Sequence, residues 1–283
     1  MLLGAHMSVA GGLSKALERA QSVGANAVQI FTKNQNRWEQ KPTPQEELDR
    51  WFEVQAQTGI DAVLSHAAYL INLGSPDDAL WQRSINAMAD ELTRAEALKI
   101  IGVVVHPGGH MGKGEEAGIA RIVDALNRAH EMTQGYSTLT LLETTAGQGT
   151  HLGYRFEQLR AMMDGVTAPE RIGFCFDTCH VFAAGYDLRT PDVYSATMDA
   201  FDRAVGLDRI RGFHFNDCKK ELGSRVDRHD HIGAGNLGLA PFGFILNDPR
   251  FSNTPMILET EKSEDMHEDV ENLNRLRGLI ETP

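Results

Sequence analysis

Short apolar runs alternate with longer amphipathic segments along the chain. One such run, 102–105, contains only Gly and Val before it reaches His106, which is typical of a parallel strand that is buried on both faces. Several other runs also end at a side chain with metal-binding chemistry. We expect eight strands, at Leu2–His6, Ala27–Phe31, Ala62–His66, Val103–His106, Leu139–Glu143, Gly173–Asp177, Gly212–Asn216 and Met256–Glu259.

Amphipathic stretches fill the intervals between these strands, and most of them end at Gly or at a polar turn. Their apolar positions recur with the spacing of an α-helix. Regular alternation of strand and helix is typical of a parallel α/β fold. We expect helices at Leu13–Val23, Pro44–Thr58, Leu80–Leu98, Glu115–Thr133, Arg155–Met163, Pro191–Val205, Pro241–Leu246 and Met266–Ile280.

An open doubly wound sheet and a closed barrel both fit this alternation. The open sheet usually has a Gly-rich phosphate loop after its first strand and gathers its ligands near one switch point. Here, side chains with ligand chemistry stand at the ends of at least six strands, and only a closed ring brings that many strand ends to one axis. We therefore predict an α/β fold, a TIM (β/α)8 barrel, with residues 1–283 forming a single domain.

The composition is typical of a soluble globular protein, with 42% hydrophobic and 23% charged residues. No apolar run approaches the roughly 18 residues of a membrane span, and the first residues lack a basic stretch followed by a long apolar one. We therefore expect a cytoplasmic location and no membrane partner. Cys175, Cys179 and Cys218 lack CxxC spacing, so we expect neither a disulfide framework nor a thiolate zinc site.

The formal net charge of −12 argues against a protein that coats nucleic acid through its overall charge. It leaves room for a local nucleic-acid site, because three bound divalent cations would bring about six positive charges into one cleft. The sequence also offers cationic side chains around such a cleft. They are Lys33, Arg37, Arg189, Lys219, Lys220, Arg225 and Arg228.

Nine side chains of metal-binding types stand at or just after the ends of the predicted strands. Imidazole and carboxylate ligands together favour zinc or a similar first-row ion. Buried carboxylates are costly unless they are paired or bound to a metal, so this pattern predicts a multinuclear metal site at one mouth of the barrel. The nine residues are His66, His106, Glu143, Asp177, His180, His214, Asp227, His229 and Glu259.

Two segments leave more than one interpretation open. Asp177 can cap a helix as readily as it can bind a metal, and His180 would then lie in solvent. Asp227 and His229 alternate in an extended segment, so both point to the same side and form a natural pair of ligands. A charged loop in solvent is the alternative for that pair, and His231 competes with it as a ligand.

The other histidines carry weaker signals. His6, at the end of the first strand, is expected to line the pocket or to lie behind the primary ligands. A surface role is the expectation for those in loops or helices, which are His110, His130, His151 and His267.

Segments spread over almost the whole chain resemble endonuclease IV, the zinc-dependent apurinic/apyrimidinic endonuclease of base-excision repair. The most specific of them are Asp-Thr-Cys-His at 177–180 and Asp-Arg-His at 227–229. The matching segments are Gly4–Ser8, Phe31–Gln35, Tyr69–Gly74, Glu143–Gly149, Asp177–His180, His214–Asp217, Asp227–His229 and Ile257–Thr260.

The resemblance implies a TIM barrel with three zinc ions that hydrolyses the phosphodiester bond 5′ to an abasic site in duplex DNA. The products would be a 3′-hydroxyl and a 5′-deoxyribose phosphate, and Glu143, Asp177 and Glu259 would be the catalytic carboxylates. We expect the chain to act as a monomer. The implied ligands are His66, His106 and Glu143 for the first ion, Glu143, Asp177, His214 and Glu259 for the second, and His180, Asp227 and His229 for the third.

The same resemblance implies contacts with DNA. In this family, the loop that matches Tyr69 and Leu70 fills the space left by an extruded abasic nucleotide. Two positions depart from the family pattern: Ala234 stands where many members have Glu, and Asn36 displaces by one position the arginine that some members have after Lys-Asn-Gln. The candidate DNA contacts are Tyr69, Leu70, Asn34, Arg37 and Arg228.

Two other classes of function deserve comparison. Sugar isomerases and epimerases also place histidines and carboxylates at strand ends, but around one or two metals, and nine candidate ligands exceed that need. A metal-stabilised barrel that binds nucleic acid without catalysis is the non-enzymatic alternative. It would be favoured by the loss of a primary ligand, and none is missing from the implied set.

Overall fold

Eight parallel strands close into a barrel, as the sequence predicts. The computed structural model describes residues 1–281; residues 282 and 283, which end the predicted domain, lie outside the described residues. The strand order is β1-β10-β7-β6-β5-β4-β3-β2, and β1 pairs with both β10 and β2, which closes the ring. The barrel strands are β1 (Leu2–His6), β2 (Ala27–Ile30), β3 (Ala62–His66), β4 (Gly102–Val105), β5 (Leu139–Glu143), β6 (Ile172–Asp177), β7 (Ile210–His214) and β10 (Pro255–Leu258).

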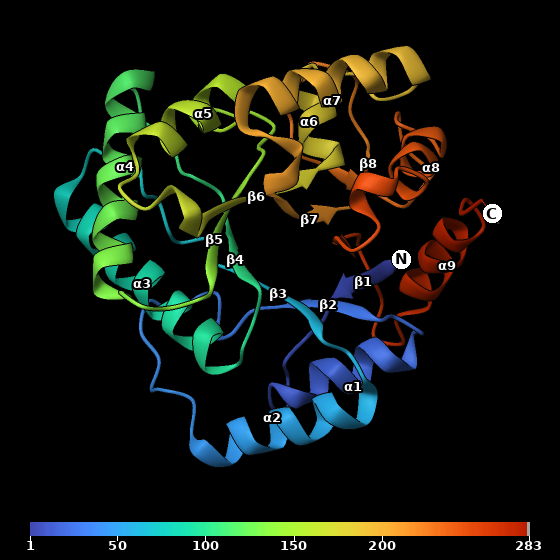
Figure 1. Cartoon of the computed structure of the whole chain (residues 1–283), viewed down its shortest axis with the longest axis horizontal. Coiled ribbons are helices and arrows are strands. Elements are labelled where there is room, and N and C mark those ends of the chain that lie inside the picture. Colours follow the sequence, from blue (N-terminus) through green and yellow to red (C-terminus); the bar gives the residue numbers. More distant parts are fainter. Residues whose placement is uncertain (282–283) are drawn as a thin grey trace.

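Helices surround the strands, and the first strand, in blue, lies near the last helix, in red (Figure 1). Within residues 1–281, no helix is both long and apolar enough to cross a membrane. Short 3-10 helices at Pro169–Arg171, Leu207–Arg209 and Pro249–Phe251 precede β6, β7 and β10. The α-helices are α1 (Ser14–Ser22), α2 (Gln45–Thr58), α3 (Asp78–Ala97), α4 (Glu115–Met132), α5 (Phe156–Gly165), α6 (Thr178–Ala184), α7 (Pro191–Val205), α8 (Ala240–Leu246) and α9 (His267–Arg277).

Most predicted strands and helices differ from the observed ones by a residue or two at their ends. The short 3-10 helices, helix α6 and the pair of β8 and β9 were not predicted. Helix α6 has seven residues that are nearly all buried, so it shows no amphipathic period. The antiparallel pair β8 (Asp217–Cys218) and β9 (His229–Asp230) is too short to show alternation.

The barrel interior is built in layers, because side chains two residues apart on a strand point to the same side. One layer is apolar and consists of Ala27, Ala62, Leu64, Val104, Leu141, Cys175 and Ile257. The next layer toward the carboxyl ends of the strands is polar. Two residues beyond members of the apolar layer stand Gln29, His66, His106, Glu143, Asp177 and Glu259, and His214 follows Gly212 in the same way.

A second and larger apolar core lies between the barrel and the helices, with Trp51, Phe156 and Phe201 among its fully buried members. Local signals fix where the helices begin and end. Helix α3 begins after Asp77, whose Oδ1 accepts a hydrogen bond from the Leu80 backbone N–H at 2.8 Å. These helices hold the strands, and hence the strand ends, in fixed positions.

His130 contradicts the surface role expected for it. Its side chain is buried on α4, and its Nε2 lies 2.9 Å from Thr140 Oγ1 on β5. Burial, helped by the nearby Arg171, lowers the pKa of His130 to about 4. The sequence could not reveal this, because the orientation of a helix position depends on the strand beneath it.

Gly4 on β1 allows the first two strands to approach closely. A Cβ atom at this position would lie 1.9 Å from the carbonyl oxygen of Ala27 on β2. We predict that Gly4→Ala lowers the free energy of unfolding by roughly 3 kcal/mol or more, because backbone rather than a flexible side chain would have to move. Urea unfolding followed by circular dichroism measures this.

Gly243→Ala in α8 is the matched control, since its nearest neighbour would be Leu279 Cβ at 4.0 Å. This variant should be unchanged or more stable by about 1 kcal/mol, because Ala favours helix over Gly. Equal unfolding midpoints for Gly4→Ala and the wild type would contradict the close approach of β1 and β2.

Candidate metal centre

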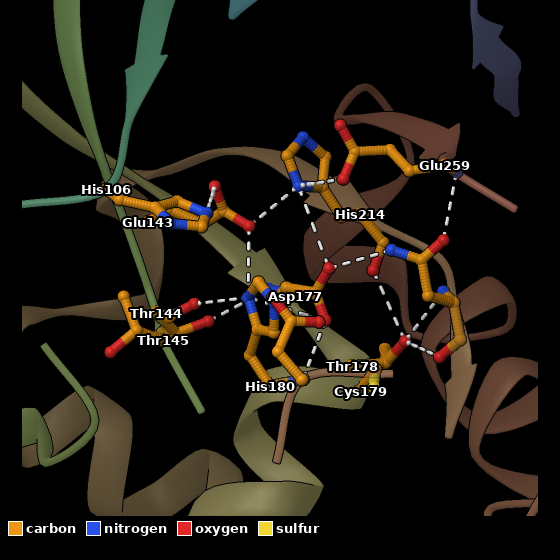
Figure 2. Close-up of polar contacts among 12 residues, drawn as sticks. His106, Glu143, Thr144, Thr145, Asp177, Thr178, Cys179, His180, His214 and Glu259 are labelled. Atoms are coloured by element: carbon orange, nitrogen blue, oxygen red, sulfur yellow. Dashed lines mark hydrogen bonds and ion pairs between the residues drawn. The ribbon is translucent and has the colours of Figure 1, made fainter. Parts of the chain in front are cut away.

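Glu143, at the end of β5, is the centre of the polar layer (Figure 2). Its side chain is fully buried. Its Oε2 atom lies 3.2 Å from His66 Nε2 and 3.0 Å from His106 Nε2. Its Oε1 atom lies 3.0 Å from His214 Nδ1 and 3.1 Å from His180 Nδ1. One carboxylate is thus shared among four imidazoles from different strands and helix α6.

All nine predicted ligand side chains gather at this mouth of the barrel. They form three groups, and within each group the potential ligand atoms lie within 4.8 Å of one another. Glu143 belongs to two of the groups, so its two oxygens can bridge two ions. The groups are His66, His106 and Glu143; then Glu143, Asp177, His214 and Glu259; and then His180, Asp227 and His229.

Backbone carbonyls orient two of the imidazoles. His66 Nδ1 lies 2.7 Å from the carbonyl oxygen of Ala67, and His180 Nδ1 lies 2.9 Å from that of Thr144. A carbonyl oxygen can only accept, so Nδ1–H donates, and Nε2 is the nitrogen left to bind a metal. In His180, Nε2 lies 3.0 Å from Asp227 Oδ2. This is the arrangement in which histidine binds a metal.

Asp177 caps a helix, and its second carboxylate oxygen also points into the polar cluster. Its Oδ1 caps α6 by accepting a hydrogen bond from the His180 backbone N–H at 2.7 Å. Its Oδ2 accepts from Asn216 Nδ2 at 2.8 Å and lies 3.7 Å from His214 Nδ1. The His180 side chain is buried, so the interpretation that placed it in solvent is wrong.

Asp227 and His229 converge on His180 from the loop that leads into β9. His229 Nε2 lies 3.2 Å from Asp227 Oδ1 and 3.4 Å from His180 Nε2. His231, the competing candidate, turns instead toward α9, where its Nδ1 lies 3.0 Å from Asn272 Nδ2. Its imidazole belongs to none of the three groups.

The charges of the cluster are strongly coupled. Burial by itself would raise the pKa of Glu143, but the imidazoles of His106 and His214 outweigh it and hold that pKa well below its usual range. Burial would likewise lower the pKa of His180, but the carboxylates of Asp177 and Asp227 raise it well above its usual range. Such buried carboxylates require positive charge beside them, which protons or cations can supply. Imidazole and carboxylate donors fit zinc.

Cys179 lies beside the cluster, and its thiol forms a further group of potential ligand atoms with Asp177 and His229. The buried thiol is 3.6 Å from the carbonyl oxygen of Arg228, to which it donates. The neighbouring Cys218 thiol and burial raise the pKa of Cys179. The expectation that no thiolate binds zinc stays a prediction.

A cleft of about 470 Å³ opens beside the cluster and is lined in part by His66, His106 and Glu259. Tyr69 stands at its edge with 65% of its surface exposed, and its ring centroid lies 5.6 Å from that of Phe31. Leu70 is half-buried. His151 also lines the cleft, which gives it a place at the site rather than on a remote surface.

The other candidate DNA contacts lie outside the metal groups. Asn34, Arg37 and Arg228 are exposed, and Asn34 Oδ1 shapes its own loop by accepting from the Asn36 backbone N–H at 2.9 Å. Lys33 does not face the cleft as the sequence analysis expected. It is buried, with its Nζ 2.8 Å from Asp90 Oδ2, and it fastens the loop to α3.

Polar residues that hold the cluster were missed at the level of sequence. Gln29, Thr144 and Asn216 are all buried and contact proposed ligands. For Gln29 the available signal was a single amide in an otherwise apolar strand. Thr144 directly follows β5 and Asn216 lies two residues after β7, where polar residues are common, so their type alone carried no signal.

The chain resembles known proteins over nearly its whole length. The family model described as xylose isomerase-like TIM barrel matches residues 17–277. A probable endonuclease 4 of Chloroflexus aggregans is 53% identical over 277 residues, which cover 98% of this chain and 97% of that protein. Endonuclease IV from Thermus thermophilus superposes with a TM-score of 0.87 at 35% identity, covering 99% of this chain and 98% of that one. A D-tagatose 3-epimerase-like protein, with a TM-score of 0.75, 18% identity and the same coverage of 99% and 98%, shares the fold alone.

Zinc binding at this centre should depend on pH. Burial by itself would lower the pKa of His229, but the hydrogen bond with Asp227 outweighs it and raises that pKa to about 9. The metal-free imidazole therefore holds a proton at pH 7 that a zinc ion must displace. The charged pair stabilises the metal-free fold most below pH 6.5, the unfolded value, and this contribution is lost as pH rises through about 9.

We predict that the apparent affinity for zinc rises by about tenfold per pH unit from about pH 7 and that the rise becomes shallower as pH approaches about 9, because the proton on His229 must be released. Competition with a chromophoric chelator at each pH measures this affinity. An affinity that stays constant over this interval would contradict the raised pKa of His229.

Proposed function

The chain belongs to the endonuclease IV family of hydrolytic nucleases, and on that basis we propose that it repairs DNA by hydrolysing the phosphodiester bond 5′ to an abasic site in duplex DNA. The cleavage leaves a 3′-hydroxyl and a 5′-deoxyribose phosphate. The enzyme uses three zinc ions and acts as a monomer. The observation that carries this proposal is the convergence of nine imidazole and carboxylate ligands, all from one chain, into three groups that share Glu143.

Each of the three groups of residues holds one zinc ion. His66, His106 and Glu143 hold the first ion, Glu143 joins Asp177, His214 and Glu259 around the second, and His180, Asp227 and His229 hold the third. When bound, zinc ions supply positive charge to the phosphodiester and activate water as a nucleophile near neutral pH. The three carboxylates Glu143, Asp177 and Glu259 hold these charges at fixed spacing, and no Ser or Cys nucleophile is needed.

Residues around the cleft act on the DNA. Extruding a nucleotide from the duplex costs a few kcal/mol and is cheapest where the base is already missing, which selects abasic sites without reading sequence. Tyr69 and Leu70 fill the space left in the duplex, as apolar wedges do in other proteins that distort DNA. Asn34, Arg37 and Arg228 contact the DNA backbone from the exposed rim.

The third group argues against the sugar epimerase alternative. One or two metals suffice for that chemistry, and His180, Asp227 and His229 would have no role in it. The low identity to the epimerase-like structure gives that alternative no support beyond the shared fold. The intact set of nine ligands likewise argues against a barrel that binds DNA without cleaving it.

Zinc content and incision of a duplex with one tetrahydrofuran abasic analogue test the proposal together. We expect about three zinc ions per chain in the wild type, and loss of incision after chelation. His229→Ala should remove one ion and lower single-turnover incision at least about a hundredfold, because charge stabilisation by a metal contributes several kcal/mol.

His231→Ala is the matched control, since this imidazole contacts Asn272 instead of the cluster. It should keep its zinc and its activity. One or two ions in the wild type, or incision that survives chelation, would refute the nuclease mechanism. A His229→Ala variant that loses an ion without losing rate would make the third ion structural.

Replacing both Tyr69 and Leu70 by Ala should weaken binding to the abasic duplex by about tenfold or more, without lowering the zinc content, because the wedge is lost while all ligands remain. Fluorescence anisotropy in the His229→Ala background measures binding with little cleavage. Leu239→Ala, another exposed apolar residue, is the control and should bind normally. If the double variant bound the abasic duplex with unchanged affinity, Tyr69 and Leu70 would not act as a wedge and would only pack at the mouth of the barrel.

A further inference from the structure

Gln29 occupies, on β2, the position that carries a proposed zinc ligand on six other barrel strands. It stands two residues beyond Ala27 of the apolar layer, in the same polar layer as Glu143 and Glu259. Its side chain is fully buried in a strand that is otherwise apolar. A buried amide must satisfy its hydrogen-bonding groups, and Gln29 does so entirely with residues of the site.

Glu259 determines which way the amide of Gln29 points. The Nε2 atom of Gln29 lies 2.7 Å from Glu259 Oε1. A carboxylate oxygen can only accept, so the reversed amide would bring two acceptors together at this distance. The second Nε2 hydrogen of Gln29 faces His6 Nδ1 at 3.1 Å. His6 therefore lies behind the primary ligands, as the sequence analysis expected.

The orientation of Gln29 determines in turn the tautomer of His214. Gln29 Oε1 lies 2.8 Å from His214 Nε2. Since this oxygen can only accept, Nε2 carries a proton, which leaves Nδ1 as the ring nitrogen that can bind a metal. That Nδ1 atom faces Glu143 Oε1 and Glu259 Oε2, each at 3.0 Å. Nδ1 thus points into the group that shares Glu143.

We propose that Gln29 is a positioning residue for the second zinc ion, holding His214 in the tautomer that presents Nδ1 and turning Glu259 so that Oε2 stays free. One side chain thereby orders two ligands that come from β7 and from the residue after β10. The inference rests on the proposed function, because it assumes that His214 and Glu259 hold zinc. Residues in this role commonly change metal affinity or activity by roughly 10- to 100-fold.

Gln29→Met keeps nearly the same volume and removes both hydrogen-bonding groups. In the zinc-loaded enzyme we expect this variant to lose zinc to a chelator about tenfold faster or more, and to incise the abasic duplex with a kcat lowered about 10- to 100-fold. The KM for the duplex should stay within about twofold, because Gln29 is buried beneath the ligands. Gln29→Ala, which cannot overpack the barrel, should show the same pattern.

Thr140→Val is the matched control. It removes the buried hydrogen bond between Thr140 and His130, which are 2.9 Å apart on the side of β5 that faces away from the cluster. This variant should retain zinc and turn over at the wild-type kcat. Wild-type chelation rates and kcat in Gln29→Met would overturn the proposal, provided that the wild type itself binds zinc and cleaves. Failure of both Gln29 variants to fold while Thr140→Val folds would also overturn it, by making Gln29 structural. A wild type without zinc or incision would instead refute the proposed function.

Discussion

The buried negative charge of Glu143 is the constraint on which the rest of the site depends. Its carboxylate is removed from water and contacts four imidazoles. Burial alone would favour the neutral acid, yet the surrounding imidazoles keep its pKa low. These imidazoles come from β3, β7, the residue after β4 and helix α6, so the charge is compensated only when the neighbouring strands from β3 to β7 have come together. Fold and site therefore depend on one another.

The two-residue period of the strands explains why the barrel can carry such a site without losing its core. Leu64 lies in the apolar layer, and His66, two residues later, is a candidate ligand; Leu141 and Glu143 repeat the step on β5. The interior thus changes from apolar to charged over one repeat. The apolar layer excludes water from below, which strengthens every electrostatic contact above it.

Much of this arrangement could be predicted from the sequence. Buried parallel strands appear as apolar runs, and the side chains at their ends are types that such runs rarely contain, so both the barrel and nine candidate ligands could be identified before the structure. Lys33 and His130 could not be placed, because their burial depends on Asp90 and on Thr140, partners distant in sequence or on another element. The role of Gln29 in the site could not be predicted, because an amide side chain is not a typical metal ligand.

The acidic character of the chain gives the proposed metals a second role. With a net charge of −12, the protein as a whole repels a DNA backbone, although Arg37 and Arg228 are exposed. Three divalent ions would reverse the local potential at the mouth of the barrel alone. Attraction of the substrate and its hydrolysis would then depend on the same bound charges. Under the proposed function, the acidic charge of the remaining surface would keep non-specific binding along intact DNA weak. Selection of the damaged site would then follow from the lower cost of extruding a nucleotide that has already lost its base.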